Sequence, residues 1–123
     1  MATRKELALD FLGHIIGGRI QEACADHIGP GFVHHNPYFK SDAASLLSGM
    51  ADSELHFPNK LFLVQHALED GDLVAVHSWL RFNQHDRGMA VVHLFRFEGD
   101  KIEEFWDVGQ AVPDEVANEL GMF

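Results

Sequence analysis

The sequence predicts an α+β domain in which a curled antiparallel sheet is covered on its concave side by helices from the N-terminal half. Apolar residues recur at helical spacing in the first half of the chain, whereas the second half holds extended apolar runs. Short turn sequences separate these runs, and short turns join strands that run in opposite directions. The length of 123 residues fits a single domain over residues 1–123.

The first two helices are marked by their start and stop signals. Thr3 and Glu6 have the spacing of a capping box, and they open a helix that ends at the glycine pair 17–18. A second helix is expected over residues 19–27, before a break at the Gly-Pro-Gly sequence 29–31.

A short strand and a third helix are expected next. The strand covers residues 32–35 and is stopped by the Asn-Pro pair 36–37. The helix begins at a cap, Ser41 or Asp42, and runs through residue 51.

Four strands are expected in the second half, after a loop over residues 55–59. Tight turns rich in Gly, Asp and Glu join the first strand to the second and the third to the fourth. A longer polar segment joins the second strand to the third. These strands are expected over residues 61–68, 73–82, 89–97 and 101–108.

Both faces of the strand over residues 73–82 are largely apolar. His77 and Trp79 lie on one face, and Val76 and Leu80 lie on the other. A sheet with one wet face alternates apolar and polar residues. Because helices cover only one apolar face, the other is expected to be a homodimer interface, sheet against sheet.

The composition disfavours several classes of partner. The formal net charge of −10, from 19 acidic residues against 9 Lys and Arg, disfavours nucleic acid and anionic membrane surfaces. No apolar run reaches the ~20 residues of a membrane span, and no signal-peptide core is present, so a cytoplasmic location is expected. The one cysteine, Cys24, allows no intrachain disulfide.

Asp107 is the first candidate for chemistry, because a carboxylate within an apolar strand is costly unless it is hydrogen-bonded or paired. The chain has nine histidines, and His35, His77 and His93 fall in expected strands. The strand faces that carry His77 and His93 are expected to be the same concave face. An Asp beside a His in an apolar cavity suits general acid/base catalysis.

Structural roles compete with these assignments. Asp107 could instead end its strand and cap a turn. The histidines are equally compatible with satisfied core residues. Arg96, on the face opposite His93, is expected to pair with an acid such as Glu103 or Glu104 on the neighbouring strand, or with one at a dimer contact.

The same residues also suggest a metal site as a hypothesis. Two of His35, His77 and His93 together with Asp107 could hold iron or zinc. His34 and His35 point to opposite faces of a strand, so they do not suit one metal ion. The chain lacks a short metal-ligand motif such as His-Glu-x-x-His, and no metal is therefore expected.

Three stretches, taken in order and spacing, carry a family resemblance. They are the His-His-Asn-Pro sequence 34–37, the sequence 71–78 around His77, and the sequence 101–110 around Asp107, followed by Gly-Met-Phe at 121–123. Together they resemble the SnoaL-like polyketide cyclase family of the nuclear transport factor 2-like superfamily, in particular its bacterial branch of aldol-condensation-type proteins. The resemblance covers nearly the whole chain.

The resemblance implies a cone-shaped (nuclear transport factor 2-like, or cystatin-like) fold, usually dimeric, with a deep apolar pocket for a small molecule. Family cyclases need no cofactor and close a ring by intramolecular aldol chemistry. Their catalytic Asp matches Asp107, and their His-Asn-Pro motif places His35 at the pocket. The expected pocket and substrate-binding residues are His77, His93, Trp79, Asn36, Phe95 and Tyr38.

Three functions follow as hypotheses. In the first, an enzyme acting α to a carbonyl uses Asp107 as general acid or base, with His35 as its partner and His77 and His93 at the developing enolate oxygen. In the second, the pocket is a binding module that holds a small apolar or aromatic ligand without turnover. The third is a metal-dependent lyase or oxygenase.

Overall fold

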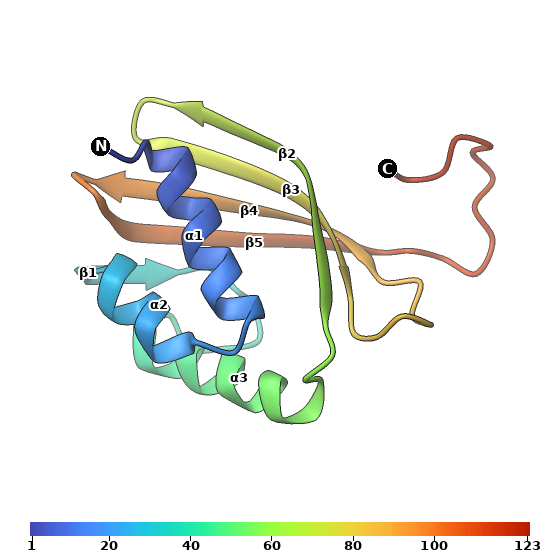
Figure 1. Cartoon of the computed structure of the whole chain (residues 1–123), viewed down its shortest axis with the longest axis horizontal. Coiled ribbons are helices and arrows are strands. Elements are labelled where there is room, and N and C mark those ends of the chain that lie inside the picture. Colours follow the sequence, from blue (N-terminus) through green and yellow to red (C-terminus); the bar gives the residue numbers. More distant parts are fainter.

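The structure is a computed structural model that describes all residues, 1–123. Three helices lie against one face of a five-stranded sheet (Figure 1). The helices are α1 (Arg4–Ile16), α2 (Ile20–His27) and α3 (Ala43–His56). The strands are β1 (Ile28–His34), β2 (Leu61–Asp70), β3 (Leu73–Arg81), β4 (Met89–Glu98) and β5 (Lys101–Ala111). The predicted α+β class, with helices on one face of a curved sheet, is confirmed.

Local capping sets the helix starts as predicted. The backbone N–H of Glu6 donates to the Thr3 hydroxyl at 3.1 Å, and the Thr3 N–H donates to the Glu6 carboxylate at 3.2 Å. Asp42 caps α3 by accepting the N–H of Ser45 at 2.8 Å. α3 continues to His56 rather than ending at residue 51, because no helix breaker occurs before Pro58.

The sheet is mixed rather than wholly antiparallel, which corrects the prediction. Its strand order is β1-β5-β4-β3-β2, and the neighbours from β2 to β5 are antiparallel. β1 runs parallel to β5 at the edge. Tight turns join later strands of the sheet and force those neighbours to be antiparallel. No short turn links β1 to β5, so β1 can run parallel to its neighbour.

The helix α2 ends at His27 as expected, but residues 29–31 lie inside β1, so the strand begins at Ile28 and not after the Gly-Pro-Gly sequence. The buried side chain of Glu103 on β5 lies against this segment. A Cβ atom at Gly29 would sit 1.9 Å from Glu103 Oε1, and one at Gly31 would sit 2.9 Å from Oε2. These glycines therefore serve the close approach of a neighbouring side chain rather than a turn.

The hydrophobic core lies between the helices and the inner face of the sheet. Phe95, at the centre of β4, is completely buried and packs edge-to-face on Phe11 of α1, with ring centroids 6.0 Å apart. The other fully or nearly fully buried core residues are Ala8, Leu12, Ala23, Phe32, Leu46, Val74, Val76, Phe97, Ile102 and Phe105. This packing fixes which face of each strand looks toward the helices.

The outer face of the sheet carries exposed apolar side chains and lacks helical cover. Leu63, Leu68 and Val108 have exposed fractions of 56%, 69% and 59%. The C-terminal segment projects beyond the end of the sheet (Figure 1), and the ring of Phe123 stacks on Trp79 with centroids 5.1 Å apart. No helix in the structure is long and apolar enough to cross a membrane.

We predict that Gly29→Ala lowers the free energy of unfolding by about 1–3 kcal/mol, because the new methyl group would overlap the buried Glu103 carboxylate. Urea denaturation measures the change. Gly13→Ala is the matched control, since a Cβ at this exposed position of α1 meets no atom within 4 Å. That control is expected to be neutral or stabilising. Equal stabilities for Gly29→Ala and the unmodified chain would contradict the packing described.

Candidate functional site

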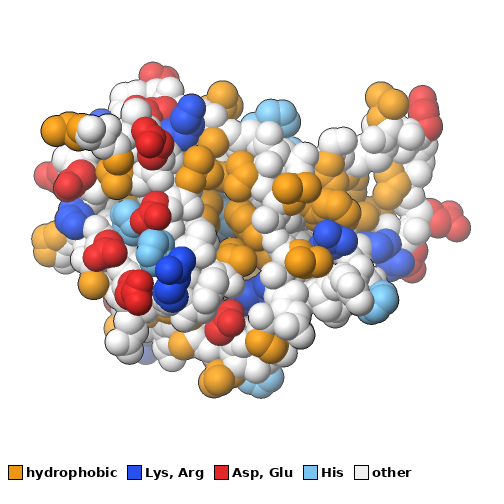
Figure 2. Space-filling model, viewed as in Figure 1, with side chains coloured by type: hydrophobic (Ala, Val, Ile, Leu, Met, Phe, Trp, Pro, Cys, Tyr) orange, Lys and Arg blue, Asp and Glu red, His pale blue; other side chains and the backbone are white.

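A cavity of about 470 Å³ lies between the inner face of the sheet and the helices α1 and α3. It is lined by 22 residues, of which 14 are hydrophobic, so its walls favour an apolar ligand. Figure 2 shows hydrophobic side chains gathered on the helix-covered side of the molecule, toward the end of the sheet. Phe11 and Leu12 of α1, Leu46 and Met50 of α3, and Phe62 of β2 belong to the lining.

His93 and Asp107 face each other on the wall of this cavity. They occupy directly opposed positions on the antiparallel strands β4 and β5. His93 Nε2 lies 3.7 Å from Asp107 Oδ1, and the side chains are 12% and 28% exposed. This separation exceeds a hydrogen bond, so a single oxygen atom of a ligand can contact both groups.

Asn36 orients the carboxylate of Asp107. The Asn36 side-chain oxygen accepts the backbone N–H of Tyr38 at 3.0 Å, which turns the amide nitrogen toward Asp107. That nitrogen donates to Asp107 Oδ2 at 3.1 Å. Oδ1, the oxygen nearer to His93, thus carries no bond from Asn36. Asn36 and Tyr38 both line the cavity, and Tyr38 is 85% exposed.

His34 holds this segment in place from the core. Its Nε2–H donates to the carbonyl oxygen of Lys40 at 2.5 Å, because a carbonyl only accepts. Its Nδ1 therefore bears the lone pair that accepts the backbone N–H of Asn36 at 3.1 Å. His34 is 2% exposed and is a positioning residue that the sequence analysis did not select. The inward position of His34 could have been predicted from the sequence, because side chains alternate between the two faces along β1.

Burial keeps His93 neutral. Desolvation lowers the pKa of His93 below its ordinary value of 6.5, and the negative charge of Asp107 offsets part of this shift. The ring stacks on Phe105 with centroids 5.5 Å apart. Its Nδ1 is buried without a hydrogen-bond partner, so the proton is better placed on Nε2, where the carboxylate of Asp107 attracts it.

A second polar group lines the cavity away from the strands β4 and β5. Lys60, just before β2, is only 7% exposed in its side chain. Its ammonium donates to the Ser53 hydroxyl at 3.1 Å and lies 3.6 Å from Glu54 Oε2. Lys60 and Ser53 were not among the residues expected from the sequence, because nothing local distinguishes a loop lysine that folds inward from one in solvent.

His35 lies on the outer face, away from Asp107, which corrects its expected placement in the pocket. Its Nε2 is 2.7 Å from Glu104 Oε2, and its ring stacks on Trp106 with centroids 5.2 Å apart. Glu104 also accepts from Arg96 at 3.0 Å, as one of the two predicted pairings. The bonds from His35 and then Arg96 hold the pKa of Glu104 below its ordinary value.

His77 and Trp79 also lie on the outer face, so the faces of His77 and His93 are not the same one. In the register between β3 and β4, His93 is opposite Val76, whereas His77 is opposite Val92. A difference of one residue in register reverses every side chain of a strand. Neither His77 nor Trp79 lines the cavity. Their polar contacts are with His66 and with the carbonyl of Arg87.

Two further expectations are settled by position. Phe95 is a core residue beneath His93 and is absent from the cavity lining. The metal ligand set weighed from the sequence does not assemble, because His35 and His77 lie across the sheet from His93 and Asp107. Of the residues predicted for the pocket, those that line the cavity are His93, Asp107, Asn36 and Tyr38.

Comparison with known proteins gives a fold. No family model and no curated protein matches the sequence. Among solved structures, a nuclear transport factor 2-like protein from Cytophaga hutchinsonii superposes with a TM-score of 0.71 at 15% identity, covering 89% of this chain and 92% of that one. AclR, a candidate hydroxylase from Streptomyces galilaeus, gives 0.74 at 21% identity over 89% and 80%. A candidate polyketide cyclase from Acidithiobacillus ferrooxidans gives 0.71 at 18% identity over 89% of each chain.

These similarities define the class of fold. The chain has the nuclear transport factor 2-like fold, as its sequence motifs led us to expect. The structures that share it include proteins described as candidate polyketide cyclases and as a candidate hydroxylase.

We predict that the stability of the protein falls below about pH 6.5 in part through His93. The folded pKa of His93 is lowered, so between the two pKa values the unfolded chain binds a proton that the folded chain does not. The free energy of unfolding is therefore unaffected by His93 above the pKa of the unfolded chain. It falls as the pH drops from that pKa toward the lower pKa of the folded chain. His93→Phe should show a smaller loss of unfolding free energy than the unmodified chain between about pH 7 and 5.

Urea titrations at a series of pH values measure this difference. The control is His85→Gln, at an exposed loop position, which should retain the pH dependence of the unmodified chain. Parallel curves for His93→Phe and the unmodified chain would refute the role given to His93.

Proposed function

We propose that the protein is a cofactor-free acid/base enzyme that acts on a proton α to a carbonyl group, as an aldol-type cyclase, isomerase or lyase. The observation that carries this proposal is the pairing of Asp107 with a neutral, buried His93 on the wall of an apolar cavity. A carboxylate is a suitable base for such a proton only if a neighbouring group stabilises the enolate that forms.

In the proposed reaction, His93 and Asp107 have different roles. The Nε2–H of His93 donates to the carbonyl oxygen of the substrate, and Asp107 Oδ1 accepts the α proton. The electron pair of the broken C–H bond moves into the enolate, whose oxygen stays hydrogen-bonded to His93. Attack of that carbon on a second carbonyl closes a ring. In an unsaturated ketone, whose enolate is conjugated with a carbon–carbon double bond, return of the proton to the far end of that system isomerises the substrate. Asp107 then gives up its proton, to the new alkoxide or to the carbon.

The neutral state of His93 suits this role. A neutral imidazole polarises a carbonyl without forming an ion pair with the Asp107 carboxylate that would weaken this base, and it remains a donor when negative charge develops. Asn36 supports Asp107 by binding the oxygen that faces away from His93. His35 and His77, on the outer face, have no part in this mechanism.

The substrate class follows from the walls of the cavity. Its hydrophobic lining favours an aromatic or polycyclic apolar body. The Lys60 ammonium, which also donates to the Ser53 hydroxyl, adds a hydrogen-bond donor for a carboxylate or enol oxygen of the substrate. Since neighbours in fold are described as polyketide cyclases, polyketone chains and aromatic ketones are the first compounds to test.

The alternative is a binding module that uses the same cavity without turnover. Its ligand would be a small apolar or aromatic carbonyl compound. The two functions differ in one measurable property, because only the enzyme exchanges the α protons of a bound ketone.

We predict that the protein accelerates deuterium exchange at the α carbon of 2-tetralone in D₂O, measured by proton NMR. Asp107→Asn should lower the exchange rate by about 10²- to 10⁴-fold, because it removes the base and keeps the shape of the side chain. The melting temperature should change little. Asp52→Asn is the control, since the Asp52 side chain on α3 is 71% exposed and lies outside the cavity lining.

The outcomes separate the two functions. Binding of 2-tetralone in a thermal-shift assay, without exchange above the rate in buffer, would favour the binding module. Exchange that persists at full rate in Asp107→Asn would remove Asp107 from the mechanism.

We further propose that two copies associate through the outer face of the sheet. Its exposed Leu63, Leu68 and Val108 form an apolar surface of the kind that interfaces bury. Light scattering should then give twice the chain mass of 13.8 kDa. Leu68→Asp with Val108→Asp should give the single-chain mass, whereas Leu55→Asp, on α3 and 81% exposed, should not. A single-chain mass for the unmodified protein would refute this assembly.

A further inference from the structure

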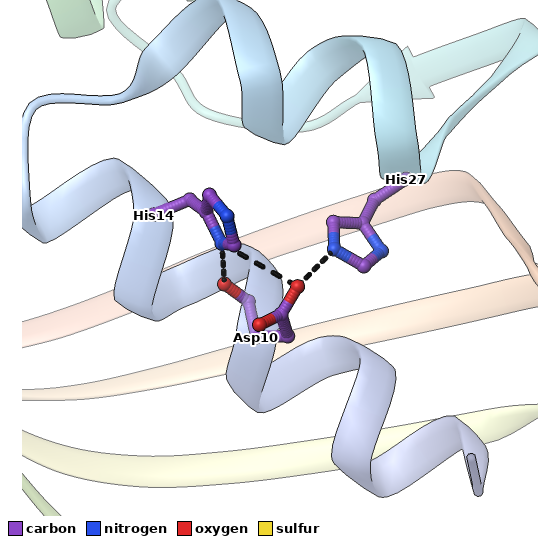
Figure 3. Close-up of side chains that lie close together, drawn as sticks. All are labelled: Asp10, His14 and His27. Atoms are coloured by element: carbon purple, nitrogen blue, oxygen red, sulfur yellow. Dashed lines mark hydrogen bonds and ion pairs between the residues drawn. The ribbon is translucent and has the colours of Figure 1, made fainter.

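A second cluster of titratable side chains lies outside the cavity, between α1 and α2. Asp10 and His14 are one helical turn apart on α1, and His27 is the last residue of α2 (Figure 3). One candidate ligand atom from each of the three side chains lies within 4.8 Å of the others. None of these residues lines the cavity, and the proposed acid/base chemistry does not use them.

The cluster is built around the Asp10 carboxylate. His27 Nε2 lies 2.7 Å from Asp10 Oδ2, and His14 Nδ1 lies 3.4 Å from the same oxygen. Figure 3 shows both imidazole rings turned toward Asp10, one from each helix. The His14 and His27 side chains are 16% and 5% exposed, whereas Asp10 is 54% exposed. The cluster therefore has dry walls and an opening to solvent.

The hydrogen bonds of His14 prepare one of its nitrogen atoms for metal binding. Its Nδ1–H donates to the backbone carbonyl of Asp10 at 2.7 Å, because that oxygen only accepts. The lone pair of the neutral ring is then on Nε2. Histidine ligands of metals are oriented in this way, with the second ring nitrogen bonded to a carbonyl or carboxylate. Glu22 Oε2 lies 3.9 Å from the same Nε2, within reach of a shared ion.

We propose that this cluster is a zinc site that joins α1 to α2, with Asp10, His14 and His27 as ligands and Glu22 or water in the fourth position. Two imidazoles and a carboxylate are a ligand set that Zn²⁺ prefers. Tetrahedral ligands about 2.0–2.1 Å from zinc lie roughly 3.3 Å from one another. To reach this spacing, the 2.7 Å between His27 Nε2 and Asp10 Oδ2 has to widen slightly, and His14 has to present Nε2 to the ion in place of Nδ1, the nitrogen that now lies 3.4 Å from Asp10 Oδ2.

His27 limits how tightly the ion binds. Without metal, its Nε2–H donates to Asp10. With Zn²⁺ on Nε2, the neutral ring must hold its proton on Nδ1, which is buried without a partner. That unpaired donor opposes binding, so we expect a dissociation constant on the order of micromolar.

The chain contains its own matched control. Asp52 and His56 on α3 repeat the one-turn spacing, with His56 Nδ1 bonded to the carbonyl of Asp52 at 2.9 Å and 3.6 Å from its carboxylate. No further histidine or cysteine completes a three-ligand group there. A pair of ligands binds zinc weakly. The third ligand, His27, is therefore what distinguishes the proposed site from the Asp52–His56 pair.

A second control is the pair His66 and His77 on the outer face of the sheet. Their Nδ1 atoms are 3.1 Å apart, and their rings stack. This pair lacks a carboxylate ligand within the same group. If two neighbouring histidines were enough to bind zinc without a carboxylate, the ion would bind at this pair.

The experiment is a calorimetric titration of tag-free, chelator-treated protein with ZnCl₂, with thermal shift measured on the same samples. We expect one ion per chain and a higher melting temperature with Zn²⁺. His14→Ala, His27→Ala and Asp10→Ala should each weaken binding at least tenfold and abolish the shift. His56→Ala and His66→Ala should bind as the unmodified chain does. Co²⁺ should give the visible absorption of a tetrahedral complex.

Several results would overturn the proposal. These are the absence of saturable binding, unchanged binding in His14→Ala and Asp10→Ala, or loss of binding in His66→Ala instead. His14 and Asp10 are the decisive positions, because their partial exposure makes their variants tolerable even if removal of the buried His27 unfolds the chain.

Discussion

The antiparallel register between β4 and β5 is the constraint on which the rest of the site depends. It sets His93 directly opposite Asp107 and turns both side chains toward the helices. The helices then exclude water from the inner face, which lowers the pKa of His93 and keeps it neutral beside a carboxylate. A shift of one residue in that register would send one of the two groups to the outer face, away from the cavity that the helices cover.

The two faces of the sheet carry different chemistry for this reason. The inner face combines aromatic walls with a few polar groups whose orientations are fixed by hydrogen bonds, as when His34 holds Asn36 and Asn36 holds Asp107. The outer face carries the ionic group of Arg96, Glu104 and His35 within an apolar surface. Titratable residues that lie side by side in the sequence thus belong to separate environments, and the cluster between α1 and α2 forms a third.

Local physics made much of the fold predictable. The capping box at Thr3, the cap at Asp42 and the tight turns between the later strands act over a few residues, and all appear in the structure. The pairing of Arg96 with Glu104 was predictable because a hairpin makes them neighbours. The parallel pairing of β1 was not, since it joins segments far apart in the chain without a short turn to dictate direction.

The sequence by itself determined the α+β class, the position of each later strand, and Asp107 as a carboxylate placed inside an apolar strand. The tertiary structure decided which residues accompany it. Sequence motifs assigned His35 and His77 to the pocket, but side-chain alternation and strand register placed both on the outer face and left His93 beside Asp107. Lys60 joined the cavity only through the packing of α3 against the sheet. The reason is physical, because facing and burial depend on register and on the layer above, which local sequence does not contain.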